Sequence, residues 1–470
     1  MDALFLSRLQ FAWLIAFHIL LPAFTVGLSC YVATLEIRYW RTRDDTIRRL
    51  SAFWIKIFAI SFGMGVVSGI VMPFQFGTNW SRFTDATSNV VGALLAYEVI
   101  TAFFLESAFL GVLLFGRKLV PQWAQALSAV LVALGTVLSS FWILAVNSWM
   151  QTPAGYEIID GRFFPLSLSA VIFTPSFPYR LAHTVSAFLI TTGFVILAVG
   201  AYYLRRGMAQ AESRIMMRVS LLFLALFVPL QIVLGDLHGL NTLQHQPANV
   251  AAMEGVWETQ RGVGASLFAI PDAEMNHLAI SIPKLASLYL THDLNGEVKG
   301  LKEWPKQDRP PVAVVYFAFR IMVGIGLLML AIVITGLILW RRGRLFETRW
   351  YLRVCQIAGA SGFIAVLAGW TVTEVGRQPW VVYGLMRTSA GVSPSLTTTD
   401  VVISLTAYVL AYAVIFGGGY VLMRRLIRIG PTPATEAEPF NEATRPMRPM
   451  SAVNETPAGQ AMPTGASDVP

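Results

Sequence analysis

The sequence predicts an all-α polytopic membrane protein with nine transmembrane helices, and three observations predict this class. Of the 470 residues, 55% are hydrophobic and only 13% are charged, which is more apolar surface than a soluble core of this length can bury. Apolar runs of about 20 residues recur, each long enough to cross the ~30 Å hydrocarbon layer of a bilayer. Basic residues cluster after every second run, which is typical of loops that stay in the cytoplasm.

The nine predicted spans cover residues 8–36, 52–77, 90–115, 124–150, 181–204, 218–236, 312–340, 355–373 and 400–424. A basic cluster follows every odd-numbered span, for example Arg341, Arg342 and Arg344 after the seventh. This alternation predicts an N-terminus outside the cell and a C-terminus inside it. No basic segment precedes the first run, so we expect a retained helix rather than a signal peptide.

Two segments are predicted to lie outside the membrane. Residues 1–236 hold the first six spans, and residues 312–430 hold the last three. Between them, residues 237–311 form a long periplasmic loop whose helical patches and hydrophobic residues indicate partial order. Residues 431–470 are rich in Pro, Ala, Thr and Met, and we expect them to form a disordered cytoplasmic tail.

Charge and cysteine content exclude several classes of function. The net charge of +8 does not indicate nucleic-acid binding, because the arginines form short clusters between apolar runs, where they set membrane topology. Cys30 and Cys355 are the only cysteines, and both lie in predicted spans. One pair of cysteines makes neither a disulfide framework nor a complete thiolate metal site.

Three residues of the spans are candidate haem ligands. His18 lies about 15 Å inside the first span, where an imidazole can hydrogen-bond to a neighbouring helix or act as an axial haem ligand. His183 and Met322 begin spans that start on the outer face, and His with Met is an axial pair of electron-transfer haems. Most membrane methionines only pack. Arg320, next to Met322, is a natural partner for a haem propionate.

Two carboxylates, Glu98 and Glu106, lie in the third span, which holds no basic residue. Their spacing gives about 12 Å of rise and about 80° of rotation, so both lie on roughly one helix face. Protonated carboxyls in this setting suit a proton relay, which Ser107, Ser139 and Ser140 would extend. The alternative is that the two carboxyls hold neighbouring helices together by hydrogen bonds.

Acidic residues also occur at the outer membrane boundary. Glu374 and Arg377 end the eighth span and are three residues apart, so they can pair on one helix face. A cofactor site for Glu374 is the other interpretation, because a charge at this depth needs a partner. The outer loop opens with residues 235–239 and contains Glu254 in a mixed apolar, amide and acidic stretch. Such a stretch suits an amphiphile whose polar head gives up protons.

Six motifs carry a resemblance to a known family. They are residues 7–11 with His18, Tyr97 and Glu98 with Glu106, residues 180–184, residues 235–239 with Gln246 and Pro247, residues 319–324, and residues 369–380. With these motifs, all of the chain except its tail resembles subunit I of cytochrome bd-type quinol oxidases. The outer loop resembles the short form that also occurs in cyanide-insensitive oxidases.

The resemblance implies three haems. His183 and Met322 would ligate a low-spin haem b, while His18 and Glu374 would each serve one of two high-spin haems. These would be a haem b and a haem d, or a further haem b in place of haem d. Which ligand serves which high-spin haem stays open. The remaining residues expected to contact a haem or a buried carboxylate are Arg8, Arg320, Trp370 and Arg377.

The resemblance also implies a reaction. Ubiquinol or menaquinol would be oxidised outside, with Glu254 accepting a proton, and dioxygen would be reduced to water. Glu106 would pass cytoplasmic protons to Glu98 at the oxygen-reducing haem, so that a proton motive force arises without pumping. The sequence departs from the family at Asn249, where a lysine is usual, and this leaves the quinol head-group contacts open.

Partners and alternatives follow from the same comparison. The resemblance implies a second, haem-free membrane subunit, allows a small single-helix subunit, and indicates the bacterial cytoplasmic (inner) membrane. A proton-coupled transporter is an alternative, since intramembrane Glu and His mark proton relays there too. The odd number of spans and the lack of a visible inverted repeat in the sequence disfavour it. A haem-free scaffold subunit that binds quinone is a third possibility.

Overall fold

The computed structural model describes residues 2–431, and these residues confirm the predicted fold class. Within this range, nine helical segments are long and apolar enough to cross a membrane, and each contains one predicted span. The segments are Ala3–Thr42, Asp45–Thr78, Ser81–Lys118, Gln122–Gln151, Phe177–Arg206, Gln210–His245, Lys306–Arg341, Arg349–Gly376 and Thr398–Ile429. The predicted disordered tail lies, from residue 432 onward, outside the described residues.

Six of the nine spans consist of one long helix each. These helices are α3 (Asp45–Thr78), α7 (Gln122–Gln151), α9 (Phe177–Arg206), α10 (Gln210–His245), α13 (Val312–Arg341) and α17 (Thr398–Ile429). The first span is divided into α1 (Ala3–Leu20) and α2 (Pro22–Thr42), because Pro22 has no N–H to donate to the His18 carbonyl. The eighth is divided into α14 (Arg349–Ala358) and α15 (Ser361–Gly376).

The third span changes helix type along its length, which the sequence did not predict. It consists of α4 (Ser81–Thr87), a π-helical turn η1 (Ser88–Gly92), α5 (Ala93–Glu98), a second π-helical turn η2 (Val99–Phe103), α6 (Phe104–Phe115) and a 3-10 turn η3 (Gly116–Lys118). A π-helical turn rotates side chains less per residue than an α-helix does. The η2 turn therefore reduces the ~80° expected between Glu98 and Glu106 and brings them closer to one face.

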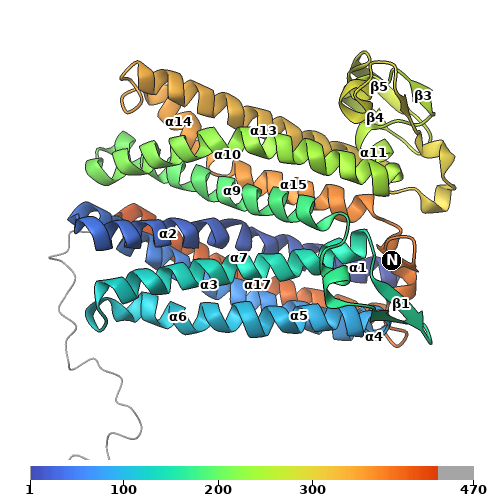
Figure 1. Cartoon of the computed structure of the whole chain (residues 1–470), viewed down its shortest axis with the longest axis horizontal. Helices are drawn as coiled ribbons and strands as arrows, with labels where there is room; N and C mark the ends of the chain where they lie inside the picture. The colour runs from blue at the N-terminus through green and yellow to red at the C-terminus, as the bar shows by residue number, and fades with distance from the viewer. Residues whose placement is uncertain (1, 432–470) are drawn as a thin grey trace, which may run out of the picture. The chain divides into compact units, whose positions relative to one another are not determined.

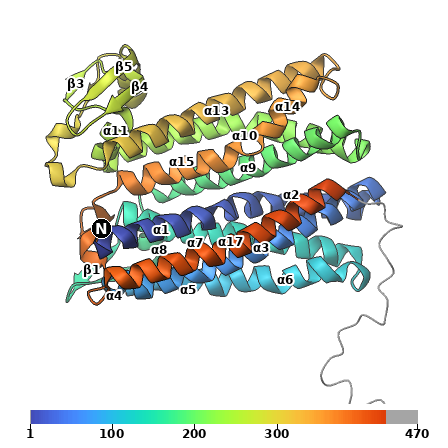
Figure 2. The same ribbon diagram turned by 180° about the vertical axis from the view of Figure 1, so that it is seen from behind.

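Helix α9 lies between two groups of spans (Figures 1 and 2). On one side it packs on α10, α14 and α15, and on the other side it packs on α2 and α7. Phe194 and Leu197 belong to the apolar core of the first group, while Ile196 and Tyr203 belong to that of the second. In the most apolar window of α9, 67% of the residues are buried, the largest share among the spans described, as expected for a helix with packing partners on two sides.

The outer loop is an ordered structure rather than a bare connector, as its hydrophobic residues predicted. Its elements are α11 (Pro247–Glu254), β3 (Gln260–Arg261), β4 (Ala265–Pro271), β5 (Asn276–Ile282), α12 (Leu285–Thr291), β6 (Glu297–Val298), η4 (Leu301–Glu303) and η5 (Lys306–Asp308). Strands β4 and β5 form an antiparallel hairpin, and β3 pairs with β6. Val250 and Leu290 of the loop pack in one core with Val315 of α13, so this core fixes the loop to a membrane helix.

Helical structure continues past residue 237, where the outer loop was predicted to begin. Helix α10 continues past residue 236 to His245, so residues 235–239 lie on a helix. The helix ends there because Pro247 disfavours an α conformation in the residue before it, and Gln246 has φ −138° and ψ 59°.

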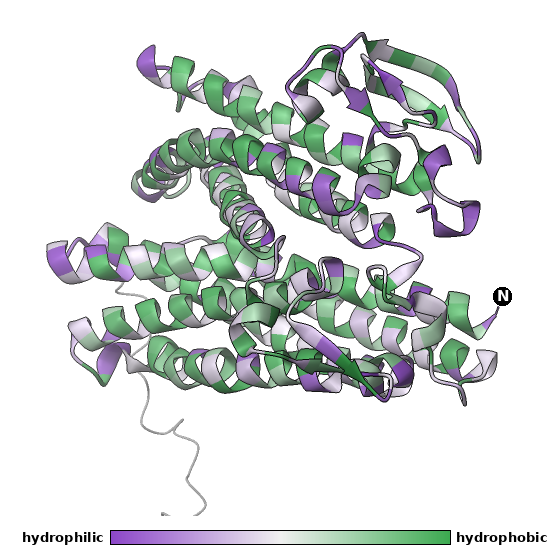
Figure 3. Cartoon of the chain, turned by 45° about the vertical axis from the view of Figure 1, so that its right-hand side comes forward, coloured by the Kyte–Doolittle hydropathy of each residue, from purple (hydrophilic) through white to green (hydrophobic). Residues whose placement is uncertain are grey.

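Two smaller hairpins lie near the ends of spans. They are β1 (Tyr156–Ile159) with β2 (Arg162–Pro165), followed by α8 (Leu168–Ile172), and β7 (Trp380–Val382) with β8 (Met386–Arg387), followed by α16 (Thr388–Gly391). The start of α1 and the outer loop lie at one end of the helix bundle, called here the outer-loop end (Figure 1). Apolar residues cover the spans, and hydrophilic residues gather in the connecting segments (Figure 3).

Candidate functional site

Most of the predicted site residues lie at the outer-loop end of the bundle. Glu374 comes from α15, His183 from α9, Met322 from α13 and Glu254 from α11. Helix α15 packs on α9, α11 and α13, and α11 also packs on α13, so residues that are far apart in the sequence become neighbours. His18 joins them through α1, which packs on α15.

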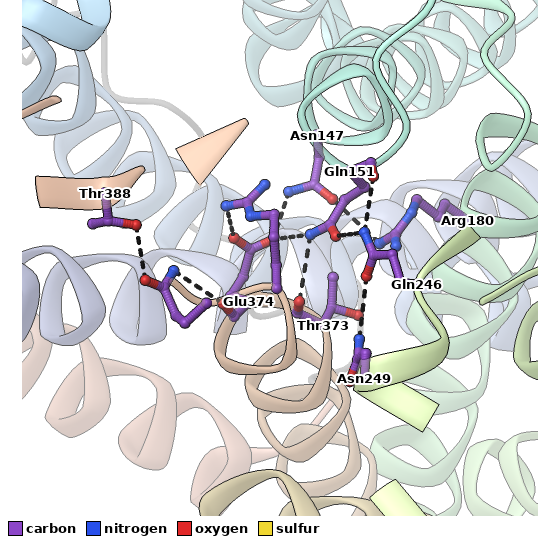
Figure 4. Close-up of polar contacts among 10 residues, drawn as sticks. Asn147, Gln151, Arg180, Gln246, Asn249, Thr373, Glu374 and Thr388 are labelled. Carbon is purple, nitrogen blue, oxygen red and sulfur yellow. Dashed lines mark hydrogen bonds and ion pairs between the residues drawn. The ribbon is translucent and has the colours of Figure 1, made fainter. Parts of the chain in front are cut away.

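Glu374 is held by side chains from two helices (Figure 4). Its Oε1 accepts hydrogen bonds from Asn147 Nδ2 at 2.7 Å and from Gln151 Nε2 at 3.2 Å, both on α7. Its Oε2 accepts from Arg377 Nη2. Arg180 on α9 completes the group by donating to Asn147 Oδ1 at 3.5 Å. The carboxylate therefore sits among two amides and two guanidinium groups.

Arg377 and Glu374 form the ion pair that their spacing allows. The two side chains pair because residues three apart on a helix lie on the same face. The ion pair occupies only Nη2 of the guanidinium group. Nε and Nη1 of Arg377 are buried without a partner among residues 2–431. Arg180 Nε is likewise buried without a hydrogen-bond partner among these residues. These donors remain free to bind a further anionic group.

A chain of three amides connects the outer loop to Glu374 (Figure 4). Asn249 Nδ2 donates to Gln246 Oε1 at 3.3 Å, and Gln246 Nε2 donates to Gln151 Oε1 at 2.7 Å. Gln151 Nε2 then donates to Glu374. All three amide side chains are buried, and each donates in the same direction, toward the carboxylate. Aligned dipoles of this kind stabilise negative charge at the end that receives the last hydrogen bond.

Sequence reasoning missed Asn147 and Gln151. Both are amides near the outer end of the fourth span, four residues apart and therefore on one face of α7. Two amides at this spacing in an apolar run could have marked a polar face of the helix. The spacing alone does not indicate which residue that face contacts.

The Gln151→Leu substitution is expected to destabilise the protein by about 1–3 kcal/mol. It leaves Glu374 with one donor fewer and Gln246 Nε2 without its side-chain acceptor, and unpaired buried polar groups cost about this much. The measurement is the thermal unfolding midpoint of the purified protein. Gln260→Leu, on the exposed strand β3, is the matched control and should leave the midpoint unchanged. An unchanged midpoint for Gln151→Leu would show that the amide chain is not a supporting structure.

His183 lies beside a second histidine that sequence reasoning did not single out. The rings of His183 and His238 have their centroids 5.5 Å apart, and His238 Nε2 is buried without a partner among the described residues. Gln231 Nε2 lies 3.2 Å from His183 Nδ1 and donates to the His183 carbonyl at 3.1 Å. A Cβ atom at position 235 would lie 3.2 Å from His183 Cε1, so Gly235 lets α10 approach the ring closely.

Met322 and His18 also face glycines. A Cβ atom at position 369 would lie 2.9 Å from Met322 Sδ. The sulfur therefore contacts the backbone of α15 at Gly369, five residues before Glu374. His18 Nδ1 lies 2.9 Å from Ser68 Oγ, and a Cβ atom at position 69 would lie 3.3 Å from His18 Cε1. With Nδ1 engaged by Ser68, Nε2 of His18 is the nitrogen left for another partner.

Glu98 and Glu106 both face α7, which confirms the prediction that they share a helix face. Ser139 Oγ donates to Glu98 Oε1 at 2.7 Å. The side chain of Glu106 packs against Gly135, one turn along α7, and its Oε1 is buried without a hydrogen-bond partner among the described residues. The two carboxyls thus lie at two depths along one helix interface.

Glu254 is buried at the end of α11 and pairs with Arg320. Arg320 Nη2 lies 3.4 Å from Glu254 Oε2, and the Tyr289 side chain also favours the charged carboxylate. Burial raises the pKa of Glu254, and Arg320 and Tyr289 partly oppose this. Arg320 also donates to the carbonyls of Met253 and Ser266, so it binds the outer loop, whereas the sequence suggested a haem propionate. These contacts form because the loop packs on α13, and the contact with a propionate stays a prediction.

Arg8 and Trp370, the other two residues predicted to contact a haem, lie on α1 and α15. Arg8 is exposed on α1, and it forms no ion pair within residues 2–431. Trp370 is half-buried on α15.

The residues present fit haem groups better than a bare metal ion. No group of three His, Cys, Asp or Glu side chains gathers to hold a metal within the described residues. A porphyrin needs only one or two axial ligands from the protein. His18, His183, Met322 and Glu374 are separate potential ligands, and the free donors of Arg180 and Arg377 match the propionates of a haem.

Comparisons with known proteins agree with this chemistry. The model of the family described as "Cytochrome bd terminal oxidase subunit I" matches residues 6–431. The "Cytochrome bd ubiquinol oxidase subunit 1" of Bacillus subtilis is 36% identical over 428 residues, covering 88% of this chain and 91% of that protein. The "Cytochrome bd-II ubiquinol oxidase subunit 1" of Escherichia coli is 32% identical over 511 residues, covering 94% and 99%. The bd oxidase structure from Geobacillus thermodenitrificans superposes with a TM-score of 0.84 at 27% identity, covering 92% of this chain and 99% of that one.

Proposed function

Because the chain belongs to the cytochrome bd terminal oxidase subunit I family, we propose that it is the haem-bearing subunit of a terminal quinol oxidase. In this proposal it oxidises quinol at the outer-loop end and reduces dioxygen to water. The observation that carries the proposal is the packing of α11 on both α13 and α15. This places Glu254 of the outer loop beside the helices of Met322 and Glu374. Family membership sets aside the alternatives of a transporter and of a haem-free scaffold.

The ligand assignment is part of the same proposal. His183 and Met322 would hold a low-spin haem b, and His18 and Glu374 would each serve one of two high-spin haems. The bound haems, two haem b and one haem d or a third haem b, would supply electron transfer and oxygen reduction. Arg377 and Arg180 would neutralise propionate charge with the donors that Glu374 and Asn147 leave free. Arg8 and Trp370 are secondary candidates for haem contacts.

Glu254 would accept a proton from quinol. It lies at the end of α11, where Arg320 keeps a positive charge beside it, and burial raises its pKa, which favours proton uptake. Asn249, where the family usually has a lysine, is buried against Gly376 and donates to Gln246. In this chain an uncharged amide therefore faces α15, so head-group recognition would rest on hydrogen bonds rather than on a fixed positive charge.

Tyr289→Phe is expected to move the acid limb of the pH dependence of quinol oxidation to higher pH. Protonated Glu254 cannot accept a proton, so turnover falls as the pH drops through its pKa. The Tyr289 hydroxyl stabilises the charged carboxylate and lowers this pKa, so its removal raises the pKa further. The measurement is oxygen uptake against pH with a soluble quinol.

Thr259→Val is the control for this pH prediction. Thr259 lies in the same loop and donates to the exposed Glu303, away from Glu254. This variant should keep the wild-type profile. A shift of the Tyr289→Phe limb toward lower pH would contradict the role given to Glu254.

Oxygen reduction needs protons from the other side of the membrane. We assign their delivery to Glu106 and Glu98 of the third span, which both face α7, where Ser139 donates to Glu98 and Gly135 packs against Glu106. Protons would enter from the cytoplasmic side, and quinol protons would leave at the periplasmic side, so that charge separates without pumping. A second, haem-free membrane subunit would complete the entry path, and a small single-helix subunit is a further possible partner.

Proteoliposomes test this arrangement. Purified enzyme that contains this chain should consume oxygen with ubiquinol or menaquinol, and it should release as many protons at the outer-loop side as electrons pass. Release of clearly more protons than electrons would indicate pumping and contradict the proposal. Absence of quinol-dependent oxygen uptake by intact, haem-loaded enzyme would contradict the proposed quinol oxidase activity itself.

A further inference from the structure

The β4–β5 hairpin of the outer loop carries an unusual amount of exposed apolar surface. Large hydrophobic side chains on the hairpin are between 44% and 74% exposed: Leu267, Phe268, Ile270, Met275, Leu278, Ile280 and Ile282. Phe268 lies opposite Ile280 across the two strands, so the two side chains form one patch. Exposed apolar patches of this kind mark an interaction surface rather than a face toward water.

The hairpin docks on α13 near the start of that helix. Ser266 Oγ lies 2.6 Å from the Tyr316 hydroxyl, and the Ser266 carbonyl accepts hydrogen bonds from Arg320 at 2.8 and 3.1 Å. Tyr316 and Arg320 are about 6 and 12 Å along the helix from Val312, at 1.5 Å per residue. Figures 1 and 2 show β4 and β5 beside this part of α13 rather than beyond its end.

The length of α13 places this docking point at the membrane boundary. Its 30 residues span about 45 Å, whereas the hydrocarbon layer is about 30 Å thick. If the excess is shared equally between the two ends, the hydrocarbon begins about 7 Å from Val312, which is beside Tyr316. The hairpin therefore lies next to the boundary between the head groups and the acyl chains.

The surface of α13 at this level is also apolar and exposed. Val314 is 49% exposed, Phe317 is 38% exposed and Ile321 is 48% exposed, as expected for side chains that face lipid. Because β4 packs directly on α13, the apolar surface of the hairpin continues the lipid-facing surface of the helix.

The charged tip of the hairpin is tied back to the protein. Asp272 pairs with His277 at 2.6 Å, and Glu274 pairs with Lys306, which lies just before α13. The Glu274–Lys306 pair holds the polar end near the segment that leads into α13, whereas the Asp272–His277 pair lies within the hairpin itself. The apolar middle of the hairpin is then left facing outward without charged residues of its own.

We propose that the β4–β5 hairpin is an interfacial anchor that rests in the outer boundary region of the bilayer beside α13. Its partner is the lipid surface itself, and the anchor fixes the outer loop relative to the membrane. Apolar side chains at the boundary bind by burying area in the lipid, as interfacial segments do in general. This inference does not depend on the haem or quinol assignments.

Site-directed spin labelling tests the proposal in the complete enzyme. A nitroxide is attached at Ile280→Cys in a background with Cys30→Ser and Cys355→Ala, in nanodiscs of phosphatidylcholine and phosphatidylglycerol. Collision rates are measured with oxygen, which concentrates in lipid, and with a water-soluble nickel chelate. Ser281→Cys, whose side chain points to the opposite face of the strand, is the matched control. Glu297→Cys, on the exposed β6 strand, is the water reference.

We expect the ratio of oxygen to nickel collisions at position 280 to be several-fold higher than at positions 281 and 297. A ratio at position 280 equal to that of the water reference would overturn the proposal. Exclusion of both reagents from position 280 would overturn it as well, because a protein partner would then cover the patch. Unchanged unfolding midpoints for the labelled variants ensure that the ratios report on folded protein.

Discussion

Met322→Leu is expected to remove the low-spin haem b signal and to lower quinol oxidase turnover by at least ~100-fold. Leucine keeps the volume of methionine but lacks the sulfur that would ligate iron. Mutating a residue that only hydrogen-bonds to a metal ligand typically lowers metal affinity or activity by 10–100-fold. Loss of an axial ligand itself should lower activity at least as much. The sulfur of Met322 faces Gly369, which has no side chain. A leucine of similar volume therefore fits at position 322 without pushing α15 away. The measurements are the reduced-minus-oxidised absorption spectrum and oxygen uptake.

Met329→Leu provides the matched control for this experiment. Met329 lies on the same helix, is buried in an apolar core with residues of α10, and is not one of the proposed haem ligands. It should retain every haem signal and full turnover. Retention of the low-spin signal in Met322→Leu would refute the assignment of Met322. Loss of all haem signals at once would indicate misfolding, and the milder Met322→His variant, which keeps an axial ligand, then separates ligation from packing.

Glu106→Gln is expected to slow oxygen reduction by about 100-fold while leaving the reduced spectrum of the haems intact. The amide has the shape of the carboxyl group but cannot release and take up a proton, and proton transfer by a positioned group contributes about 10²–10⁴-fold. Glu106 suits this role because it is buried against Gly135 with one oxygen unpaired among residues 2–431. Stopped-flow oxidation of the fully reduced enzyme by dioxygen measures the step directly.

Glu347→Gln controls for the loss of a carboxylate as such. Glu347 is exposed in the loop between α13 and α14. This variant should oxidise at the wild-type rate. An unimpaired rate in Glu106→Gln would mean that the two carboxyls of the third span only hold α6 and α7 together.

The fold followed from the sequence because membrane physics constrains it tightly. Each span has to be apolar over about 20 residues, and this requirement located all nine helical segments. Boundaries were less accurate, since a helix does not need to end where the lipid ends. Helix α10 continues through Pro229 to His245 and ends where Pro247 disfavours an α conformation in the residue before it.

The candidate site could be predicted only in part. Isolated charges in apolar runs, such as Glu106 and Glu374, stand out because their burial is costly. Amides do not carry this signal, and so Asn147 and Gln151 were missed although both contact Glu374. The contacts of Arg320 with the carbonyls of the outer loop were not predicted either. Choosing among several nearby acceptors depends on how the loop and the helix end fold, and spacing along the chain does not determine that.

The haem content of the purified enzyme tests the central claim most directly. The measurement is a reduced-minus-oxidised absorption spectrum combined with extraction and quantification of haem per copy of this chain. The account predicts three haems, with one low-spin b-type signal and a high-spin pair in which a red-shifted chlorin band appears if haem d is present. A properly folded chain without haem bands, or one that binds a single haem, would contradict the account.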